Sequence, residues 1–249
     1  MVNVVTLHRI VDTKIEMFSD ITRDLMAGIV ESVESVGCEA TTLGESFDHS
    51  IIAKAPLVIS LTFDDGWDSH YQYVFPLLVR LGMKATFFIT VNWVGKKNYL
   101  NWGQIREMSV AGMEIGSHTM NHPMVTDLKK EEIIEEVGTS KSILEDKLGR
   151  EIKGFSFPGG FYNREAIKIV RDSGYSLICT SRPGINRGRP GLIRRNSINS
   201  LTDLRDLTKI IMPGRLDLLG KEMLHITKGA MIGVLGERNY VLLRNKLFR

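Results

Sequence analysis

Short apolar runs alternate with longer helix-like stretches along most of the chain, and this alternation restricts the fold more than any other feature. The intervening stretches have helical periodicity, and the first helix is expected over residues 18–36 with Ser19 as its N-cap. This order predicts an α/β fold with parallel strands, in a barrel or an open sheet, and chemistry at the carboxyl ends of the strands. The runs that read as strands cover residues 2–7, 57–63, 85–90, 113–116, 155–157, 176–180 and 195–198.

The charge is distributed unevenly along the chain. Residues 182–249 contain 14 Lys and Arg against 5 Asp and Glu, whereas residues 1–181 contain 18 against 24. We therefore divide the chain into a barrel, residues 1–200, and a basic helical extension, residues 201–249, packed on or beside it. Apolar and cationic residues alternate in this extension, which suits peripheral contact with an anionic membrane, although an ordinary solvated face would have the same pattern.

Other classes of protein are disfavoured by composition. No stretch approaches 18 consecutive apolar residues, and the first residues lack the zones of a signal peptide. Cys38 and Cys179 lie far apart, so a disulfide framework is not expected. No nucleic-acid fold signature accompanies the basic segment. We expect a cytoplasmic protein, peripheral at most to the inner face of the membrane and without a nucleic-acid partner; the sequence leaves the oligomeric state open.

Two adjacent carboxylates, Asp64 and Asp65, follow a buried strand. A turn would explain them, but carboxylates leaving a buried strand repel one another unless a positive charge compensates. His118 and His122 follow another strand, in a segment that a proline makes more typical of a loop than of a helix. Two imidazoles and one carboxylate form the ligand set of a catalytic Zn²⁺ or a similar divalent cation. One aspartate would bind the cation and the other would remain free.

Three motifs, TFDDG (62–66), SHTMNHP (117–123) and FSFPGG (155–160), resemble those of the polysaccharide deacetylase family, the NodB-homology group of carbohydrate esterases. The similarity extends over about residues 2–198. It implies a distorted (β/α) barrel with about seven parallel strands, and metal-dependent hydrolysis of N-acetyl groups, with zinc as the expected metal. On the matching positions it implies that Asp64 is the general base, that Asp65, His118 and His122 bind the metal, and that the Gly159 amide stabilises the oxyanion.

The general acid departs from the commonest family pattern, in which a histidine late in the domain protonates the leaving amine. The late candidate here is His225, well beyond the last expected strand. His8, in VVTLHRI, resembles instead the YHxI-type N-terminal motif of poly-N-acetylglucosamine deacetylases, in which the order of motifs is circularly permuted. We therefore expect His8 to be the acid, with His225 as the alternative.

A second departure is Ser156, at a position where many relatives carry an arginine that orients the base aspartate. Serine cannot make that forked, charged contact. Arg194 or Arg195, at the start of the last strand, could replace the missing arginine, and the sequence does not decide which of them points inward. We include Arg195 among the residues on the substrate side of the site.

The substrate side should also contain aromatic rings, because sugar rings present apolar faces. Trp67 and Phe161 are expected there, together with Gly159. The expected function is removal of N-acetyl groups from an amino-sugar glycan, or from a lipid-linked amino-sugar intermediate of surface-polymer assembly. The alternatives are a catalytically altered glycan-binding protein on the same fold, a deformylase or esterase that acts on a lipid-linked sugar, and an iron oxygenase, which has a similar ligand set.

Overall fold

Parallel pairing runs through the whole main sheet. The computed structural model describes residues 1–38, 40–53, 57–188, 191–236, 239–240 and 242–243. In this part of the chain seven strands follow one another in the order β10-β1-β5-β6-β7-β8-β9, and the short β4 pairs with the start of β5. The bounds are β1 (Val2–Leu7), β4 (Ala40–Thr41), β5 (Val58–Phe63), β6 (Ala85–Ile89), β7 (Glu114–Ser117), β8 (Gly154–Ser156), β9 (Leu177–Cys179) and β10 (Asn196–Ser197).

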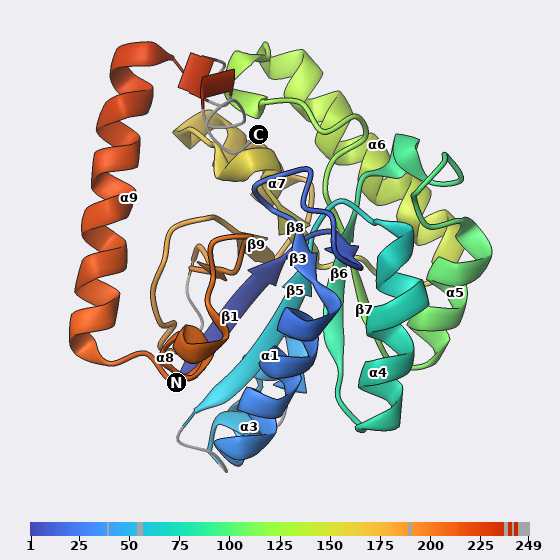
Figure 1. The fold of residues 1–249 in the computed structure, drawn as a ribbon. Coiled ribbons are helices and arrows are strands. Elements are labelled where there is room, and N and C mark those ends of the chain that lie inside the picture. The colour runs from blue at the N-terminus through green and yellow to red at the C-terminus, as the bar shows by residue number, and fades with distance from the viewer. Residues whose placement is uncertain (39, 54–56, 189–190, 237–238, 241, 244–249) are drawn as a thin grey trace.

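The two ends of this sheet meet through one short segment. Cys179 in β9 forms a parallel bridge with Ile193, whose amide donates to the Ile178 carbonyl over 2.8 Å. The same segment continues into β10, which pairs with β1. The sheet is therefore curled into a distorted barrel, with the strands at the centre of Figure 1. The expected fold class is confirmed.

Burial and register explain how the barrel brings distant residues together. Every residue of β1 and β5 is buried, as expected for parallel strands covered on both faces. Leu7 pairs with Phe63, and the Asp64 amide donates to the Leu7 carbonyl over 3.0 Å. His8 and Asp64 therefore leave the sheet next to one another, although 56 positions separate them in the sequence.

Most of the helices surround the sheet on its outer side, as Figure 1 shows. The first begins later than expected, so the prediction of Ser19 as its N-cap is wrong. Ile21 pairs with Ile10, which keeps the chain extended, and the hydroxyl of Thr22 then accepts the Leu25 amide as the cap. The bounds are β2 (Ile10–Val11), β3 (Ile21–Thr22), α1 (Arg23–Ser35), α2 (Leu43–Ser46), α3 (His49–Ile52), α4 (Phe75–Arg80), α5 (Trp102–Val110), α6 (Lys130–Leu148) and α7 (Arg164–Asp172).

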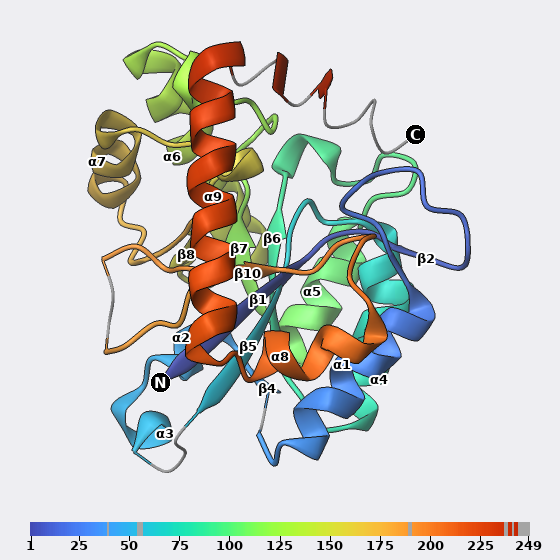
Figure 2. The same cartoon turned by 60° about the vertical axis from the view of Figure 1, so that its left-hand side comes forward.

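The C-terminal helices differ in how they meet the barrel. In α8 (Leu207–Ile211), Leu207, Ile210 and Ile211 are buried, and the Asn3 side chain donates to the carbonyls of Ile210 and Ile211. In α9 (Arg215–Leu235), none of the side chains that the structure describes is buried, and this helix lies along the outside of the molecule (Figure 2). Among the described residues, no helix combines the length and apolarity needed to cross a membrane.

Candidate active site

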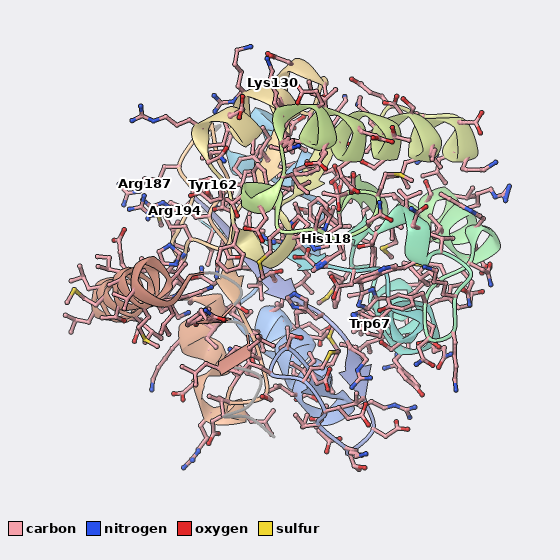
Figure 3. The ribbon with its side chains drawn as sticks, turned by 90° about the horizontal axis from the view of Figure 1, so that it is seen from above. Trp67, His118, Lys130, Tyr162, Arg187 and Arg194 are labelled. Atoms are coloured by element: carbon pink, nitrogen blue, oxygen red, sulfur yellow. The ribbon has the colours of Figure 1, made fainter. Side chains whose placement is uncertain are left out.

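The polar clusters of the sequence meet at the carboxyl ends of the strands. Asp64 and Asp65 follow β5, and His118 follows β7, whose neighbour in the sheet is β8. His122 comes from the loop after His118, and the turn with Gly159 follows β8. In a view from above, His118 lies near the centre of the molecule (Figure 3).

Asp65, His118 and His122 form a cluster with the geometry of a metal site. The Asp65 Oδ1 atom lies 3.4 Å from Nε2 of His118 and 3.4 Å from Nε2 of His122, and the three ligand atoms all lie within 4.8 Å of one another. Ligands about 2.0–2.1 Å from a tetrahedral Zn²⁺ would be about 3.3–3.4 Å apart. Oδ1 is buried and has no hydrogen-bond partner among the described residues. These residues therefore fit a tetrahedral cation.

The backbone holds two of these residues in a conformation that L-residues rarely adopt. The φ angles are 78° at Asp65 and 61° at His122, and Thr119 between the two histidines has a φ of 67°. Each such residue costs on the order of 1 kcal/mol. Gly66, with a φ of 83°, continues the turn after Asp65 without that cost. Strain of this kind concentrates at functional sites, and here it aims the carboxylate and the imidazole at one point.

Neighbouring groups orient the candidate ligands. The His118 Nδ1–H donates to the Ser156 carbonyl over 2.7 Å, which leaves Nε2 without a proton and facing Asp65. Burial lowers the pKa of His118 to about 4 despite the nearby Asp64 charge. The Trp67 indole N–H donates to the second carboxylate oxygen of Asp65 over 3.0 Å. A neutral imidazole with its other nitrogen hydrogen-bonded is the usual form of a metal-binding histidine.

Asp64 is held by a different partner, Arg195. The guanidinium donates from NH1 to Oδ1 and from NH2 to Oδ2, each over 2.8 Å, and both side chains are almost fully buried. NH2 also donates to the Ser156 hydroxyl over 2.8 Å. Burial alone would raise the pKa of Asp64, but the combined effect of Arg195, which contributes most to the lowering, and of His118 and His8 outweighs burial and brings that pKa to about 2. Asp64 therefore remains a carboxylate.

This contact shows which arginine points inward. Arg194 points away from Asp64, and its guanidinium donates to the Pro183 carbonyl and forms an ion pair with Glu222 at 3.5 Å. The Ser156 hydroxyl lies within 3.2 Å of Asp64. Arg195 thus makes the forked contact with Asp64 that Ser156 cannot make.

His8 lies beside the two aspartates and interacts electrostatically with both. The turn after Asp65 fixes its backbone, because His70 Nε2–H donates to the His8 carbonyl over 2.8 Å and the Ser69 hydroxyl accepts the Ile10 amide. His70 is fully buried, and burial lowers its pKa to about 4. This clamp was not predicted from the sequence, where His70 is an isolated histidine in a helix-like stretch.

His225 occupies a different environment, on α9. Its electrostatic neighbours are Lys228, Arg182, Glu222 and Arg194, and neither aspartate of the site is among them. Of the two candidate histidines, His8 is therefore the one that lies near Asp64 and Asp65.

Aromatic rings form one wall of the site. Trp67 stacks on Tyr99 with centroids 4.5 Å apart, Tyr99 lies 4.9 Å from Trp93, and Trp93 stacks on His122 at 5.0 Å. Trp67 is only 8% exposed and supports Asp65, whereas Trp93 and Tyr99 are half-buried. Contact of Trp67 with a sugar stays a prediction. The structure adds Tyr99 to the aromatic wall; this residue was not predicted, because it belongs to none of the sequence motifs.

The turn after β8 carries the other two expected substrate residues. Gly159 is exposed and has a φ of 62°, and a side chain there would collide with the Phe161 ring. The Gly160 amide donates to the Phe157 carbonyl and the Phe161 amide to the Pro158 carbonyl. Among the amides of this turn, that of Gly159 is the one available to an oxyanion. Phe161 is mostly buried, and the Lys228 ammonium lies 5.6 Å from the centre of its ring.

Comparison with known proteins agrees with this geometry. Residues 53–178 match the family model described as "Polysaccharide deacetylase". The chain is 34% identical over 126 residues to YxkH of Bacillus subtilis (strain 168), covering 51% of this chain and 45% of that protein. It is 33% identical over 125 residues to a peptidoglycan-N-acetylglucosamine deacetylase of Bacillus cereus, covering 50% and 56%. The chain thus spans about half the length of these relatives.

Solved structures show the same fold. The deacetylase PplD of Streptococcus pyogenes, in complex with acetate, superposes with a TM-score of 0.76 at 22% identity, over 85% of this chain and 98% of that one. IcaB from Ammonifex degensii superposes with a TM-score of 0.74 at 24% identity, over 85% and 95%. Because the matched family model covers just over half of the residues and includes Asp64, Asp65, His118 and His122, the chain belongs to the polysaccharide deacetylase family.

Proposed function

We propose that this protein is a metal-dependent hydrolase that removes N-acetyl groups from an amino-sugar glycan. The observation that carries the proposal is the division of work between two adjacent carboxylates. Asp65 directs an unpartnered oxygen at two imidazoles, whereas Asp64 is held by Arg195 and does not belong to that cluster. This arrangement supplies one carboxylate to bind a cation and a second, free of the cation, to act as a general base.

The proposed ligands are Asp65, His118 and His122, and the proposed cation is Zn²⁺. When bound, such a cation polarises the acetyl carbonyl and makes a water molecule acidic enough to lose its proton near neutral pH. Asp64 accepts that proton. Arg195 donates to both Asp64 oxygens and the Ser156 hydroxyl donates to Oδ2, so Oδ1 keeps acceptor capacity while the ionised form of Asp64 is stabilised.

The acid and the oxyanion donor come from other strand ends. We assign protonation of the leaving amine to His8, which the backbone clamp from His70 holds beside Asp64. The Gly159 amide is the proposed donor to the carbonyl oxygen as negative charge develops on it. We propose that Trp67, Phe161 and the Trp93–Tyr99 wall contact the sugar ring of the substrate; the stacked rings of Trp67, Tyr99 and Trp93 support this.

The finer proposal concerns the substrate and its location. Lys228 of α9 lies against the Phe161 ring, so the C-terminal helix adjoins the proposed substrate side. We propose a lipid-linked N-acetylated amino sugar, presented at the inner face of a membrane, as the substrate. The division into a barrel, residues 1–200, and an extension, residues 201–249, stays a proposal, and within that extension α8 packs against the barrel.

An acetate-release screen tests the proposal. Purified protein loaded with Zn²⁺ should release acetate from chitooligosaccharides, from β-1,6-linked N-acetylglucosamine oligomers or from lipid-linked N-acetylhexosamines, and the Asp64→Asn variant should not. Formate release from N-formyl substrates would indicate the deformylase alternative. Glycan binding without product release would indicate a binding protein, and oxygen consumption would indicate an oxygenase; each of these results would overturn the proposal.

A further inference from the structure

Helix α9 has its polar side turned inward. Surface helices normally turn charged residues to solvent and apolar residues to the core. Here the described charged side chains of α9 are all half-buried: Asp217, Lys221, Glu222 and Lys228. Every exposed residue whose side chain is described in this helix is uncharged. The large apolar side chains on this outward face are Leu216, Leu219, Met223, Leu224, Ile226, Met231, Val234 and Leu235.

Polar contacts rather than apolar packing join α9 to the barrel. Glu222 accepts a hydrogen bond from Arg182 over 2.8 Å and lies 3.5 Å from Arg194, and Lys228 lies over Phe161. No described side chain of α9 is buried. The described part of the chain therefore leaves the apolar side of α9 uncovered, although monomeric proteins rarely expose contiguous apolar surfaces of more than a few hundred Å².

The width of the outward apolar face favours contact with a membrane surface over contact with a partner helix. At 100° per residue, its side chains extend from Ile226 to Leu235 over about half of the helix circumference. Leu216 and Val234, which are 82% and 85% exposed, lie on one line about 27 Å apart along the axis. A helix pair needs a narrower stripe, two positions in seven. An apolar face this broad matches a helix lying in the plane of a bilayer interface.

The positive charge around α9 favours a bilayer with anionic headgroups. Residues 182–249 have 14 basic against 5 acidic residues. On the barrel beside α9, Arg182 and Arg187 are exposed, and Arg187 and Arg194 lie on the same side of the molecule as α9 in Figure 3. Cations beside an apolar face are attracted to anionic headgroups by about 1 kcal/mol each near the surface.

From this orientation we propose that α9 docks the enzyme on an anionic membrane, with its outward apolar face in the headgroup region and the neighbouring arginines on the lipid phosphates. Docking does not depend on the catalytic assignments. It would deepen the proposed function by bringing the Phe161 side of the site close to lipid-linked substrate.

Vesicle flotation of the full-length protein tests this docking. The wild-type protein should float with vesicles of phosphatidylcholine and about one-third phosphatidylglycerol at low salt, and much less with phosphatidylcholine alone or at high salt. The variant Leu216→Glu/Leu224→Glu should lose at least about tenfold in partitioning, because it places two charges on the apolar face. The matched control is Val110→Glu on α5, since Val110 is 83% exposed on a different element and should float like the wild type.

Melting temperature and acetate release from a soluble oligosaccharide should be the same in all three proteins, which separates a docking defect from a folding or catalytic one. The proposal is overturned if the wild type does not float with anionic vesicles at low salt, or if the double variant floats as well as the wild type. A wild-type dimer that the double variant converts to monomer, without vesicle binding by either, would assign the face to a second copy of the chain and also overturn it. Vesicle binding without acetate release would refute only the proposed function.

Discussion

The substitution Arg195→Met tests whether Arg195, rather than its neighbour Arg194, is the counter-ion of Asp64. Arg195 is 1% exposed and Asp64 is 3% exposed, so the substitution leaves a buried carboxylate without its counter-ion. Removing one partner of a buried ion pair costs about 3–5 kcal/mol. At about 2–4 °C per kcal/mol for a domain of this size, the melting temperature should fall by roughly 6–20 °C. The matched control is Arg194→Met, which removes a partly exposed contact worth less than about 1 kcal/mol.

The pH dependence of stability gives a second check with a definite sign. In the wild type the pKa of Asp64 is lowered from 3.8 to about 2, because Arg195 together with His118 and His8 outweighs the effect of burial. The resulting stability is present above about pH 4 and is lost as the pH falls through 2. Without Arg195 the largest contribution that lowers this pKa is lost, so we expect burial to raise the folded-state pKa of Asp64 above its wild-type value and ionised Asp64 to destabilise the fold at neutral pH.

The stability deficit of Arg195→Met should therefore be largest at neutral pH and should shrink as the pH is lowered toward 4. Urea unfolding followed by tryptophan fluorescence, at pH 7.5 and pH 4.5, measures it for both variants. The acid limb of the acetate-release profile should move to higher pH in Arg195→Met and stay in place in Arg194→Met. Equal stability of Arg195→Met and the wild type, or a larger loss in Arg194→Met, would refute the buried-pair reasoning.

The other predictions concern the metal and the proton transfers. His118→Ala should abolish both zinc binding and turnover, because it removes one of three ligands; full occupancy by elemental analysis would contradict the ligand assignment. Asp64→Asn should retain the metal and lose about 10²–10⁴-fold in acetate-release rate, as expected on loss of a general base; loss of metal as well would mean that the roles of the aspartates are exchanged. His8→Ala should lower turnover with metal retained and remove the alkaline limb of the pH–rate profile; the same effect in His225→Ala instead would assign the acid to α9.

Local sequence determined the strands and the place of the chemistry. β1 and β5 are short runs that consist mostly of β-branched and large apolar residues, which is the pattern expected of buried parallel strands. Polar residues that directly follow such runs must lie at one edge of a parallel sheet, so Asp64, Asp65 and His118 were expected to meet there. The start of α1 was not determined locally, because the pairing of Ile21 with Ile10 set it.

Only the tertiary structure decided which side chains work together. The choice between Arg194 and Arg195 depends on which face of one extended segment turns inward, and the closure of the barrel between β9 and β1 decides that. The His70 contact with His8 requires the register of β1 against β5. The sequence predicted a basic helical extension over residues 201–249, but the orientation of α9 within it depends on ion pairs that Arg182 and Arg194 make with Glu222 across 40 and 28 positions of the chain. The local sequence determines which residues of a segment can be buried, whereas contacts between distant segments determine which neighbouring residues those side chains meet.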